Sequence, residues 1–370
     1  MSNAKNERWV VKIGSAQLTD SDGLLSRDRI ESFTHQLIEI LKENIEVVLV
    51  SSGAIAAGLG KLGWEKRPAA LHKLQAAAAV GQMELVQLWE SHFHQHDIKT
   101  AQVLLTQEDL RDRKRYLNAR STLITLIEEQ VLAIINENDT VATDEIRVGD
   151  NDNLAAMVSN LVDADLLVIL TDQDGLYNRD PRSNPEAELI TRADSTDPQL
   201  LSFAGGTGNE LGTGGMRTKV EAAKVAALSG TDTIIVNGSL ERILLQIAAG
   251  ETPGTLLEAP QQPLAARKQW IVSQLEPAGN LILDDGAARI VSEDGKSLLA
   301  VGVTQVTGYF KRGDLVNLSN SQGEIIASGL VNYNNDECLL IAGKNSSEIE
   351  NLLGYINEPE LVHRNNLVLS

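Results

Sequence analysis

The stretch Val148–Pro181 decides the fold class of this chain, and it reads VGDNDNLAAMVSNLVDADLLVILTDQDGLYNRDP. Its apolar residues over Leu154–Val162 predict a helix, and the solid apolar run Leu166–Leu170 predicts a strand that is buried on both faces. Three short polar residues precede the helix: Asp150, Asn151 and Asp152. One of them can cap the helix. Capping does not require three polar side chains in succession, so we interpret this stretch as a candidate site.

The same alternation of strand and helix signals extends on both sides of this stretch. Strand-like runs lie at Trp9–Ile13, Val47–Val50, Thr100–Leu105, Val131–Ile135 and Asp232–Val236. Apolar residues at helical spacing occur over Arg27–Asn44, Ala69–His92, Tyr116–Gln130 and Leu240–Ala249. We expect the second of these helices to be broken near Gly81. The alternation predicts an α/β domain with a parallel sheet.

The pattern changes after about Leu257. The segment Ala259–Arg267 is rich in Pro, Gln and Ala and is typical of a linker. Short β-type runs then alternate with turns, at Leu281–Leu283, Leu299–Val303, Leu315–Leu318, Ile325–Val331 and Leu339–Ile341. They predict a small β-barrel or β-sandwich. We therefore expect a domain over residues 1–258, a linker over 259–277 and a second domain over 278–370.

Composition limits the partners of the chain. Its 370 residues include 32 Lys and Arg against 51 Asp and Glu, which gives a net charge of −19. Such a chain repels nucleic acid and anionic membranes unless a basic patch is set apart. The single Cys338 suits a reducing compartment, and the polar start is not that of a signal peptide. We expect a soluble, cytoplasmic protein without a membrane span.

Several strand-like runs end in polar or small residues, and open α/β sheets bind ligands at that edge. Lys12 stands next to Gly14 in KIGSA, and the run Ser51–Ala54 follows the second strand. Both segments can approach a phosphate, although an exposed lysine and tight helix–strand packing are the alternatives. The residues 136–139 follow another strand, so Asp139 and Asn151 could face the same crevice.

A glycine-rich segment, 205–219, precedes a further helical pattern. It is not a Walker A loop, because Gly-Lys-Ser/Thr does not follow at the required spacing. Its backbone N–H groups and Lys219 could still hold a phosphate, and a flexible surface loop is the alternative. The six His residues form no convincing metal triad with the carboxylates, so we interpret them as surface residues.

Six short motifs, in order along the chain, resemble the bacterial glutamate 5-kinases of the amino acid kinase family. They are KIGSA at 12, VSSGAIAAG at 50, INENDTVAT at 135, VGDNDN at 148, ILTDQDGLY at 169 and LGTGGMRTK at 211. The likeness runs almost end to end, and the C-terminal part resembles a PUA domain. Ala16 departs from the small polar residue that the family commonly has there.

The resemblance implies a parallel-sheet α/β/α sandwich followed by a β-barrel-like PUA domain. It implies transfer of the γ-phosphoryl group of ATP, accompanied by Mg²⁺, to the side-chain carboxylate of L-glutamate, as the first step of proline synthesis. Inhibition by proline, a homo-oligomer such as a tetramer, and hand-off of the product to glutamyl phosphate reductase are further expectations. The protein itself is expected to supply no metal site.

The resemblance also implies roles for individual residues. It makes Lys12, Lys219 and Asp152 catalytic, with Asp152 holding both ammonium groups. Glutamate would contact Ser52, Gly53, Ala54, Asp139, Asp150 and Asn151. ATP would contact Lys12, Thr171, Asp172, Thr213, Gly214, Gly215, Met216, Arg217, Thr218 and Lys219.

Three alternatives remain open. A kinase for another acid, such as an aspartate or carbamate kinase, can share the fold, although the INENDT and VGDNDN texts favour glutamate. PUA domains often bind RNA, but residues 278–370 hold six Lys and Arg against twelve Asp and Glu, a difference of −6. A sensor of amino acids without catalysis would not need both lysines.

Overall fold

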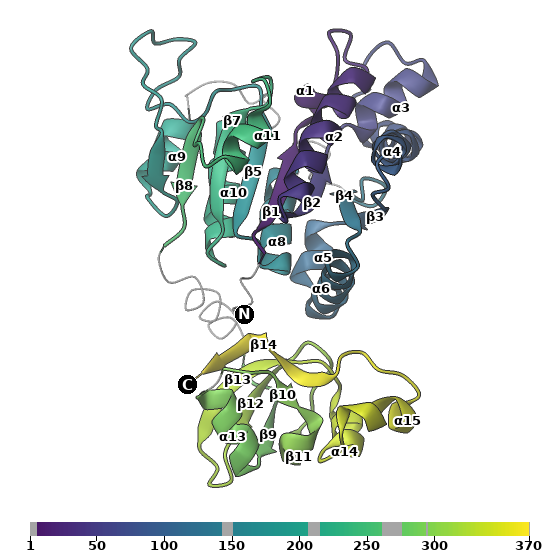
Figure 1. Cartoon of the computed structure of the whole chain (residues 1–370), viewed down its shortest axis with the longest axis vertical. Helices are drawn as coiled ribbons and strands as arrows, with labels where there is room; N and C mark the ends of the chain where they lie inside the picture. Colours follow the sequence, from purple (N-terminus) through teal and green to yellow (C-terminus); the bar gives the residue numbers. More distant parts are fainter. Residues whose placement is uncertain (1–5, 143–150, 206–214, 261–275, 294, 370) are drawn as a thin grey trace. The chain divides into compact units, whose positions relative to one another are not determined.

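The computed structural model describes residues 6–142, 151–205, 215–260, 276–293 and 295–369 (Figure 1). The chain divides into two compact units, Met1–Leu110 with Ala119–Pro263, and Arg111–Asn118 with Leu264–Ser370. This division differs from the expected domains in one segment, because Arg111–Asn118 groups with the C-terminal part. The domain boundaries drawn from the sequence stay a prediction.

The first unit is built on an eight-stranded sheet with the order β3-β4-β2-β1-β5-β7-β8-β6. Its strands are β1 Arg8–Ile13, β2 Glu46–Ser51, β3 Thr100–Leu105, β4 Leu132–Glu137, β5 Leu166–Thr171, β6 Arg192–Asp194, β7 Asp232–Asn237 and β8 Thr255–Glu258. The pairs from β3 to β7 are all parallel, which confirms the predicted parallel sheet. The β7–β8 pair is antiparallel, so the sheet is mixed near one edge.

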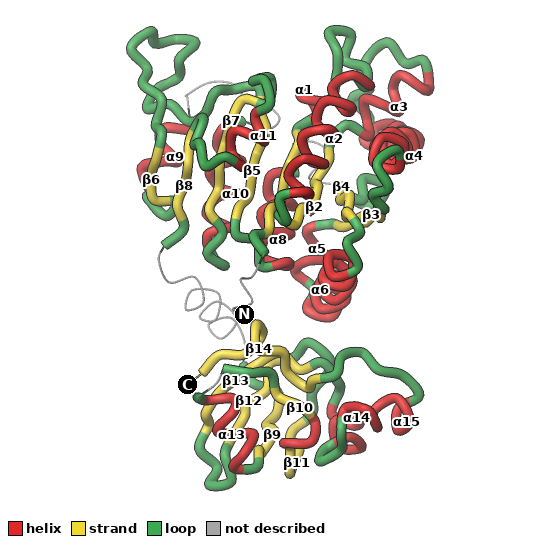
Figure 2. The backbone as a smooth tube through the Cα atoms, viewed as in Figure 1, coloured by secondary structure: helices red, strands yellow, loops and turns green. Residues whose placement is uncertain are grey.

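Helices cover both faces of this sheet, as Figure 2 shows. They are α1 Ser15–Leu18, α2 Arg27–Lys42, α3 Ala54–Leu62, α4 Leu71–His94, α5 Gln107–Arg111, α6 Arg113–Glu128, α8 Asp152–Val162, α9 Gln199–Ala204, α10 Met216–Ala227 and α11 Ile243–Ala248. Successive strand residues point to opposite faces. Trp9, Val11 and Ile13 therefore pack with the apolar faces of α2, α4 and α11. Val10 and Lys12 face the other side, where α8 and α10 pack against each other and against the sheet.

Helix α4 runs through Gly81 without a break, so the predicted interruption is wrong. Gly81 and Gly58 instead allow α3 and α4 to approach each other closely. A Cβ on Gly81 would lie 1.9 Å from the carbonyl oxygen of Ala54, and one on Gly58 would lie 1.8 Å from that of Ala77. A glycine inside a helix can mark backbone contact rather than an end, since only a hydrogen fits between the two chains.

The second unit contains a six-stranded sheet with the order β10-β14-β13-β12-β9-β11. Its elements are β9 Gly279–Leu283, α13 Asp285–Ser292, β10 Leu298–Leu299, η1 Ala300–Gly302, β11 Val303–Gly308, β12 Leu315–Ser319, β13 Ile325–Val331, α14 Asn335–Ile341, η2 Ser346–Glu348, α15 Ile349–Leu353 and β14 Glu360–Leu369. The sheet packs on a main apolar core, with a small separate cluster at Leu315 and Leu330. The predicted strands near Leu281, Leu315 and Ile325 are confirmed.

Two predicted strands of the second unit are wrong. Leu339–Ile341 forms the end of α14, because Asn334 and Glu337 make a reciprocal capping box at its start. Cys338 and Ile341, three positions apart, are buried on one side of this helix. The predicted strand Leu299–Val303 is interrupted by the 3₁₀ turn η1, so strand structure remains only at its two ends.

Candidate active site

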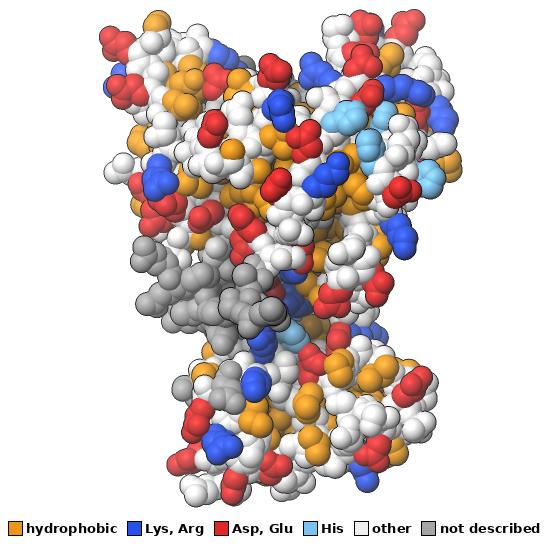
Figure 3. Space-filling view, in the orientation of Figure 1, with side chains coloured by type: hydrophobic (Ala, Val, Ile, Leu, Met, Phe, Trp, Pro, Cys, Tyr) orange, Lys and Arg blue, Asp and Glu red, His pale blue; other side chains and the backbone are white. Residues whose placement is uncertain are grey.

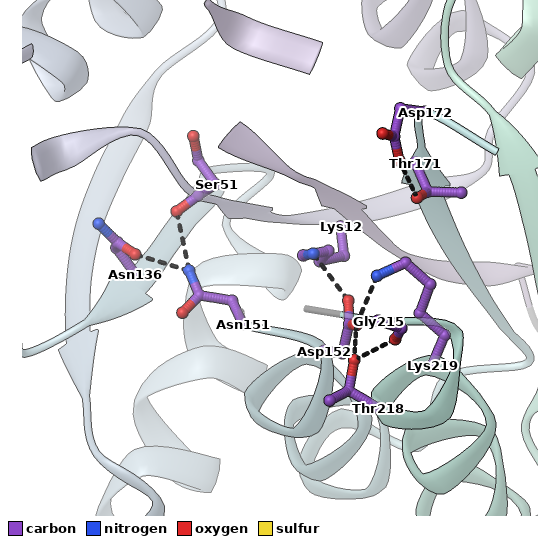
Figure 4. Close-up of polar contacts among 10 residues, drawn as sticks. All are labelled: Lys12, Ser51, Asn136, Asn151, Asp152, Thr171, Asp172, Gly215, Thr218 and Lys219. Atoms are coloured by element: carbon purple, nitrogen blue, oxygen red, sulfur yellow. Dashed lines mark hydrogen bonds and ion pairs between the residues drawn. The ribbon is translucent and has the colours of Figure 1, made fainter. Parts of the chain in front are cut away.

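Three charged side chains meet at the end of β1. Lys12 Nζ lies 2.7 Å from Asp152 Oδ1, and Lys219 Nζ lies 2.9 Å from Asp152 Oδ2. Their exposed fractions are 2% for Lys12, 0% for Asp152 and 3% for Lys219. Figure 4 shows both ammonium groups directed at one carboxylate. The residues that we expected to act together are therefore in contact, whereas their roles stay predictions.

The fold explains why these three residues meet. Lys12 points to the face of the sheet that α8 and α10 cover, and these helices carry Asp152 and Lys219 in their first turns. A carboxylate in the first turn of a helix is stabilised by the positive end of the helix dipole. The hydroxyl of Thr218 also lies 2.9 Å from Asp152 Oδ2. The Asp152 carboxylate at the start of α8 is thereby held between Lys12 on β1 and the first turn of α10, although the three elements are far apart in the sequence.

A set of amide groups lies beside this cluster at the ends of β2 and β4. Asn151 Nδ2 donates to Asn136 Oδ1 at 2.7 Å and to the carbonyl oxygen of Ser51 at 3.2 Å (Figure 4). The Glu137 N–H also donates to Asn136 Oδ1, at 2.9 Å. Because Asn151 directly precedes Asp152, the amide set and the charged cluster share one helix start.

A cavity of about 510 Å³ opens over the amide set. Among the predicted glutamate residues, Ser52, Gly53, Ala54, Asp139 and Asn151 line it. Sequence reasoning missed the other polar residues of its wall, including Asn136, Glu137 and Arg67. Asn136 and Glu137 belong to the INENDT text that we had quoted, but nothing in the sequence shows which of these side chains face the cavity. The predicted residue Asp150 lies outside the described residues.

Gly53 is one of the residues that line this cavity. It has a φ of +108°, which suits glycine, and it directly precedes α3. The turn after β2 can therefore bring the free N–H groups at the start of α3 to the cavity, and such groups bind anions.

The remaining predicted residues lie on the other side of β1. Thr171 ends β5, and its hydroxyl donates to Asp172 at 3.2 Å, while Gly215 precedes α10. Met216, Arg217 and Thr218 form the first turn of α10 together with Lys219. Thr213 and Gly214 lie outside the described residues. The strand order β4-β2-β1-β5 thus places the cavity on one side of the charged cluster and Thr171 on the other.

The described residues contain no group of three or more His, Cys, Asp or Glu side chains that could hold a metal ion. No helix among the same residues is both long and apolar enough to cross a membrane.

Comparison with known proteins places the chain in a family. The amino acid kinase family matches residues 7–237, and the PUA domain matches residues 279–353. The chain belongs to the amino acid kinase family. Within that family the chain is similar to glutamate 5-kinases: it is 58% identical to a glutamate 5-kinase of Pseudomonas aeruginosa over 98% of this chain and 97% of the relative.

Two further relatives carry the same name. Glutamate 5-kinase of Ectopseudomonas mendocina is 57% identical over 98% of this chain and 97% of that protein. Glutamate 5-kinase of Pseudomonas fluorescens is 57% identical over 98% of both chains. The resemblance that we drew from six short motifs is therefore confirmed over almost the whole length.

Proposed function

We propose that this chain transfers the γ-phosphoryl group of ATP to the side-chain carboxylate of L-glutamate and so forms L-glutamyl 5-phosphate. The relatives that share more than half of its sequence over nearly full length are named glutamate 5-kinases. The single structural observation that carries the proposal is the contact of Lys12 and Lys219 with Asp152, between the cavity and Thr171. The product is the first intermediate of proline synthesis.

Lys12 and Lys219 are assigned to the transferring phosphoryl group. Phosphoryl transfer depends mostly on positioning and on neutralising the charge that spreads over the phosphoryl oxygens. Two ammonium groups against the Asp152 carboxylate give these three side chains a formal sum of 2 − 1 = +1. Asp152 orients both ammonium groups, because each of its oxygens contacts one lysine. An orientation fixed before the reaction stabilises the transition state without a cost of rearrangement.

The acceptor needs no general base. A carboxylate is already ionised near pH 7, so the attacking oxygen carries its charge before it meets the phosphoryl group. Asp139 and Asn151 are assigned to the ammonium end of glutamate, since both offer oxygen atoms in the cavity wall. Ser52 and the N–H groups of Gly53 and Ala54, at the start of α3, are assigned to the reacting carboxylate.

The nucleotide is assigned to Thr171, Asp172 and the start of α10, including Gly215, Arg217 and Thr218. The residues present fit a Mg²⁺ ion that is carried by the phosphates, because Thr171 and Asp172 place hydroxyl and carboxylate oxygens together at the end of β5, and Mg²⁺ prefers oxygen ligands. When bound, the ion supplies further neutralisation of phosphate charge. Free N–H groups at the start of α10 and Lys219 would face the phosphates from the protein side.

Several expectations accompany this proposal. The resemblance implies inhibition by proline, a homo-oligomer that is often a tetramer, and hand-off of the product to glutamyl phosphate reductase. A cytoplasmic location is supported by the single cysteine of the chain. We assign the PUA domain a structural or regulatory role rather than RNA binding, and Figure 3 shows acidic and basic side chains intermixed over its visible face.

A hydroxamate assay tests the proposal. The protein is incubated with ATP, Mg²⁺, hydroxylamine and one acid at a time, and the trapped acyl phosphate is measured. We expect L-glutamate to be the preferred acceptor and aspartate to be poor, because a chain one methylene shorter misplaces its carboxylate. A misplacement of about 1 Å can lower the rate on the order of 100-fold. Equal or faster turnover of aspartate or of carbamate would show a different acid kinase.

The variant Asp139→Asn tests the assignment of the cavity. It removes a negative charge opposite the substrate ammonium group, and we expect the KM for glutamate to rise while the KM for ATP changes little. Asp109→Asn serves as a control, because Asp109 caps the start of α5, where it accepts from the N–H and hydroxyl of Thr106. An unchanged KM for glutamate in Asp139→Asn would show that the ammonium group binds elsewhere.

A further inference from the structure

Helix α4 supports the polar wall of the cavity from behind through two side chains. Gln82 Oε1 accepts a hydrogen bond from Asn136 Nδ2 at 2.6 Å. Trp89 Nε1 donates to the hydroxyl of Ser51 at 3.0 Å. Positions 82 and 89 are two helical turns apart and lie on one face of α4. Ser51 and Asn136 are the two residues that hold the amide of Asn151, so one helix face supports both of its contacts.

The position of Gln82 is fixed by the close packing of α3 on α4. Its neighbour Gly81 is buried, and a Cβ there would lie 1.9 Å from the carbonyl oxygen of Ala54 and 2.2 Å from the nitrogen of Gly58. Helix α4 therefore cannot rotate or slide easily against α3. The backbone that carries Gln82 is held against the same helix whose first turn lines the cavity.

The hydrogen bonds that begin at Gln82 run in one direction. Gln82 offers an oxygen to the nitrogen of Asn136, and the Glu137 N–H donates to its oxygen, so Asn136 turns its nitrogen toward Gln82 and its oxygen toward Asn151. Asn151 then uses both N–H bonds of its amide, one toward Asn136 and one toward Ser51. The oxygen and the nitrogen of an amide lie on different branches of one planar group, so fixing one fixes the other. Asn151, which lines the cavity, is consequently left with its carbonyl oxygen as the group for a ligand.

We propose that Gln82 is a positioning residue that acts through Asn136 to hold Asn151 with its oxygen toward the acceptor, and that this direction selects an acid carrying an ammonium group. The inference rests on the proposed function and deepens it. An ammonium group donates to the Asn151 oxygen and is attracted by Asp139 in the same wall. A reversed amide would offer N–H groups instead, and these would favour a carboxylate. Gln82 itself does not line the cavity, so its effect passes through Asn136.

The test compares two acceptors that differ only in the ammonium group. Glutarate has both carboxylates of L-glutamate and lacks the amino group. The kcat/KM ratio of glutamate to glutarate is measured by the hydroxamate assay, with inhibition by glutarate as a second readout. The variant Gln82→Met removes the acceptor oxygen at similar side-chain length. We expect the ratio to fall about 3- to 10-fold, which corresponds to one net hydrogen bond. The KM for ATP should change little.

Two single variants provide controls. Gln82→Glu keeps an acceptor oxygen, so its ratio should not fall. Gln87→Met makes the same substitution on an exposed position of α4, outside the cavity wall, and should behave like the unaltered protein. Equal loss of activity toward both acids in Gln82→Met, with an unchanged ratio, would overturn the proposal and leave Gln82 as a structural support.

A double-variant cycle guards against misfolding of Gln82→Met. Asn136→Asp removes the amide donor that needs Gln82 and retains oxygen atoms for Asn151 and the Glu137 N–H. In this background, Gln82→Met should no longer lower the ratio, because the direction of Asn151 is set without it. A further loss as large as in the single variant contradicts the proposal. If the unaltered protein does not turn over glutamate, the proposed function fails instead, whereas normal turnover with an unchanged ratio refutes the inference alone.

Discussion

The carboxyl edge of the first sheet and the core of the second unit bury polar groups in different ways. At the sheet edge, Lys12, Asp152 and Lys219 are each at most 3% exposed. In the described part of the second unit, the buried side chains with hydroxyl or amide groups are all uncharged, namely Ser319, Asn332, Tyr333 and Asn366, and they are set around an apolar core. Taking a charge out of water costs several kcal/mol per ion, and pairing with an opposite charge offsets this cost only in part. The first unit therefore bears an energetic cost that the second avoids.

The comparison teaches where to look for chemistry. Lysines that are paired and withdrawn from water keep their orientation, and a fixed orientation is what the transition state of a phosphoryl transfer requires. In the core of the second unit, a buried polar group serves the fold and not a reaction. The Tyr333 hydroxyl donates to the carbonyl oxygen of Glu358 and accepts from two N–H groups, so it only satisfies the backbone of a loop. Its burial explains folding and points to no reaction.

The largest expected effect comes from breaking the charged cluster. Lys12→Ala and Lys219→Ala should each lower kcat about 10²- to 10³-fold, with a smaller change in either KM. Asp152→Asn should also lower kcat, since it releases both ammonium groups. The losses of Asp152→Asn and Lys219→Ala should be strongly non-additive, because residues that act as one unit share one penalty.

Steady-state kinetics on protein shown to be folded by circular dichroism measure these losses. Lys224→Ala, farther along the same helix, is the matched control. Fully additive losses, or a normal kcat in Lys219→Ala with only a weaker KM for ATP, would reject the shared role.

The next prediction concerns packing in the first unit. Gly81→Ala places a methyl group 1.9 Å from the backbone of α3, and overpacking of this kind typically costs about 1–3 kcal/mol of folding free energy. Gly60→Ala is the control, because its Cβ would meet only the flexible end of Leu24, at 3.0 Å. Urea unfolding of both variants gives the comparison. Equal stability of the two would mean that α3 and α4 separate readily.

A smaller effect is expected from removing the second unit. A chain ending at Leu257 keeps the residues of the charged cluster and of the cavity wall, so we expect it to retain kinase activity. Its oligomeric state or its response to proline can differ. A soluble, folded chain of this length without activity would show that the second unit contributes to the site. The expected boundary at 258 would then be wrong in function.

The smallest effect concerns Cys338. Burial, with a lesser contribution from the charge of Glu337, raises the pKa of its thiol to about 12. At pH 8 the folded protein should react very slowly with a thiol-specific disulfide reagent, and full reaction should follow unfolding in guanidinium. Because the folded pKa exceeds the unfolded value of about 8.5, ionisation should lower stability as the pH rises between the two. Rapid labelling of native protein would show that the core opens readily.

The sequence was sufficient to predict secondary structure wherever a local pattern of residues fits only one kind of element. The apolar run Leu166–Leu170 became the buried strand β5, and the run 154–162 became α8. Pattern failed at Leu339–Ile341, because three apolar residues fit a strand as well as a helix end, and the capping box that starts α14 decided between them. The pattern also failed at Gly81. A glycine in a helical pattern can mark either the end of the helix or a close contact with another helix, and the sequence does not distinguish the two.

The sequence by itself determined the family and the kinds of side chain that make up the candidate site, because Lys12, Asp152 and Lys219 each lie in a short contiguous motif. Only the tertiary structure decided which groups touch. Asn136 and Gln82 are 54 positions apart, and their hydrogen bond depends on how closely α3 packs on α4. The direction of an amide is set by its partners in space and leaves no trace in the order of residues. The wall of the cavity, and the oxygen that Asn151 turns toward it, could therefore be found only in the folded chain.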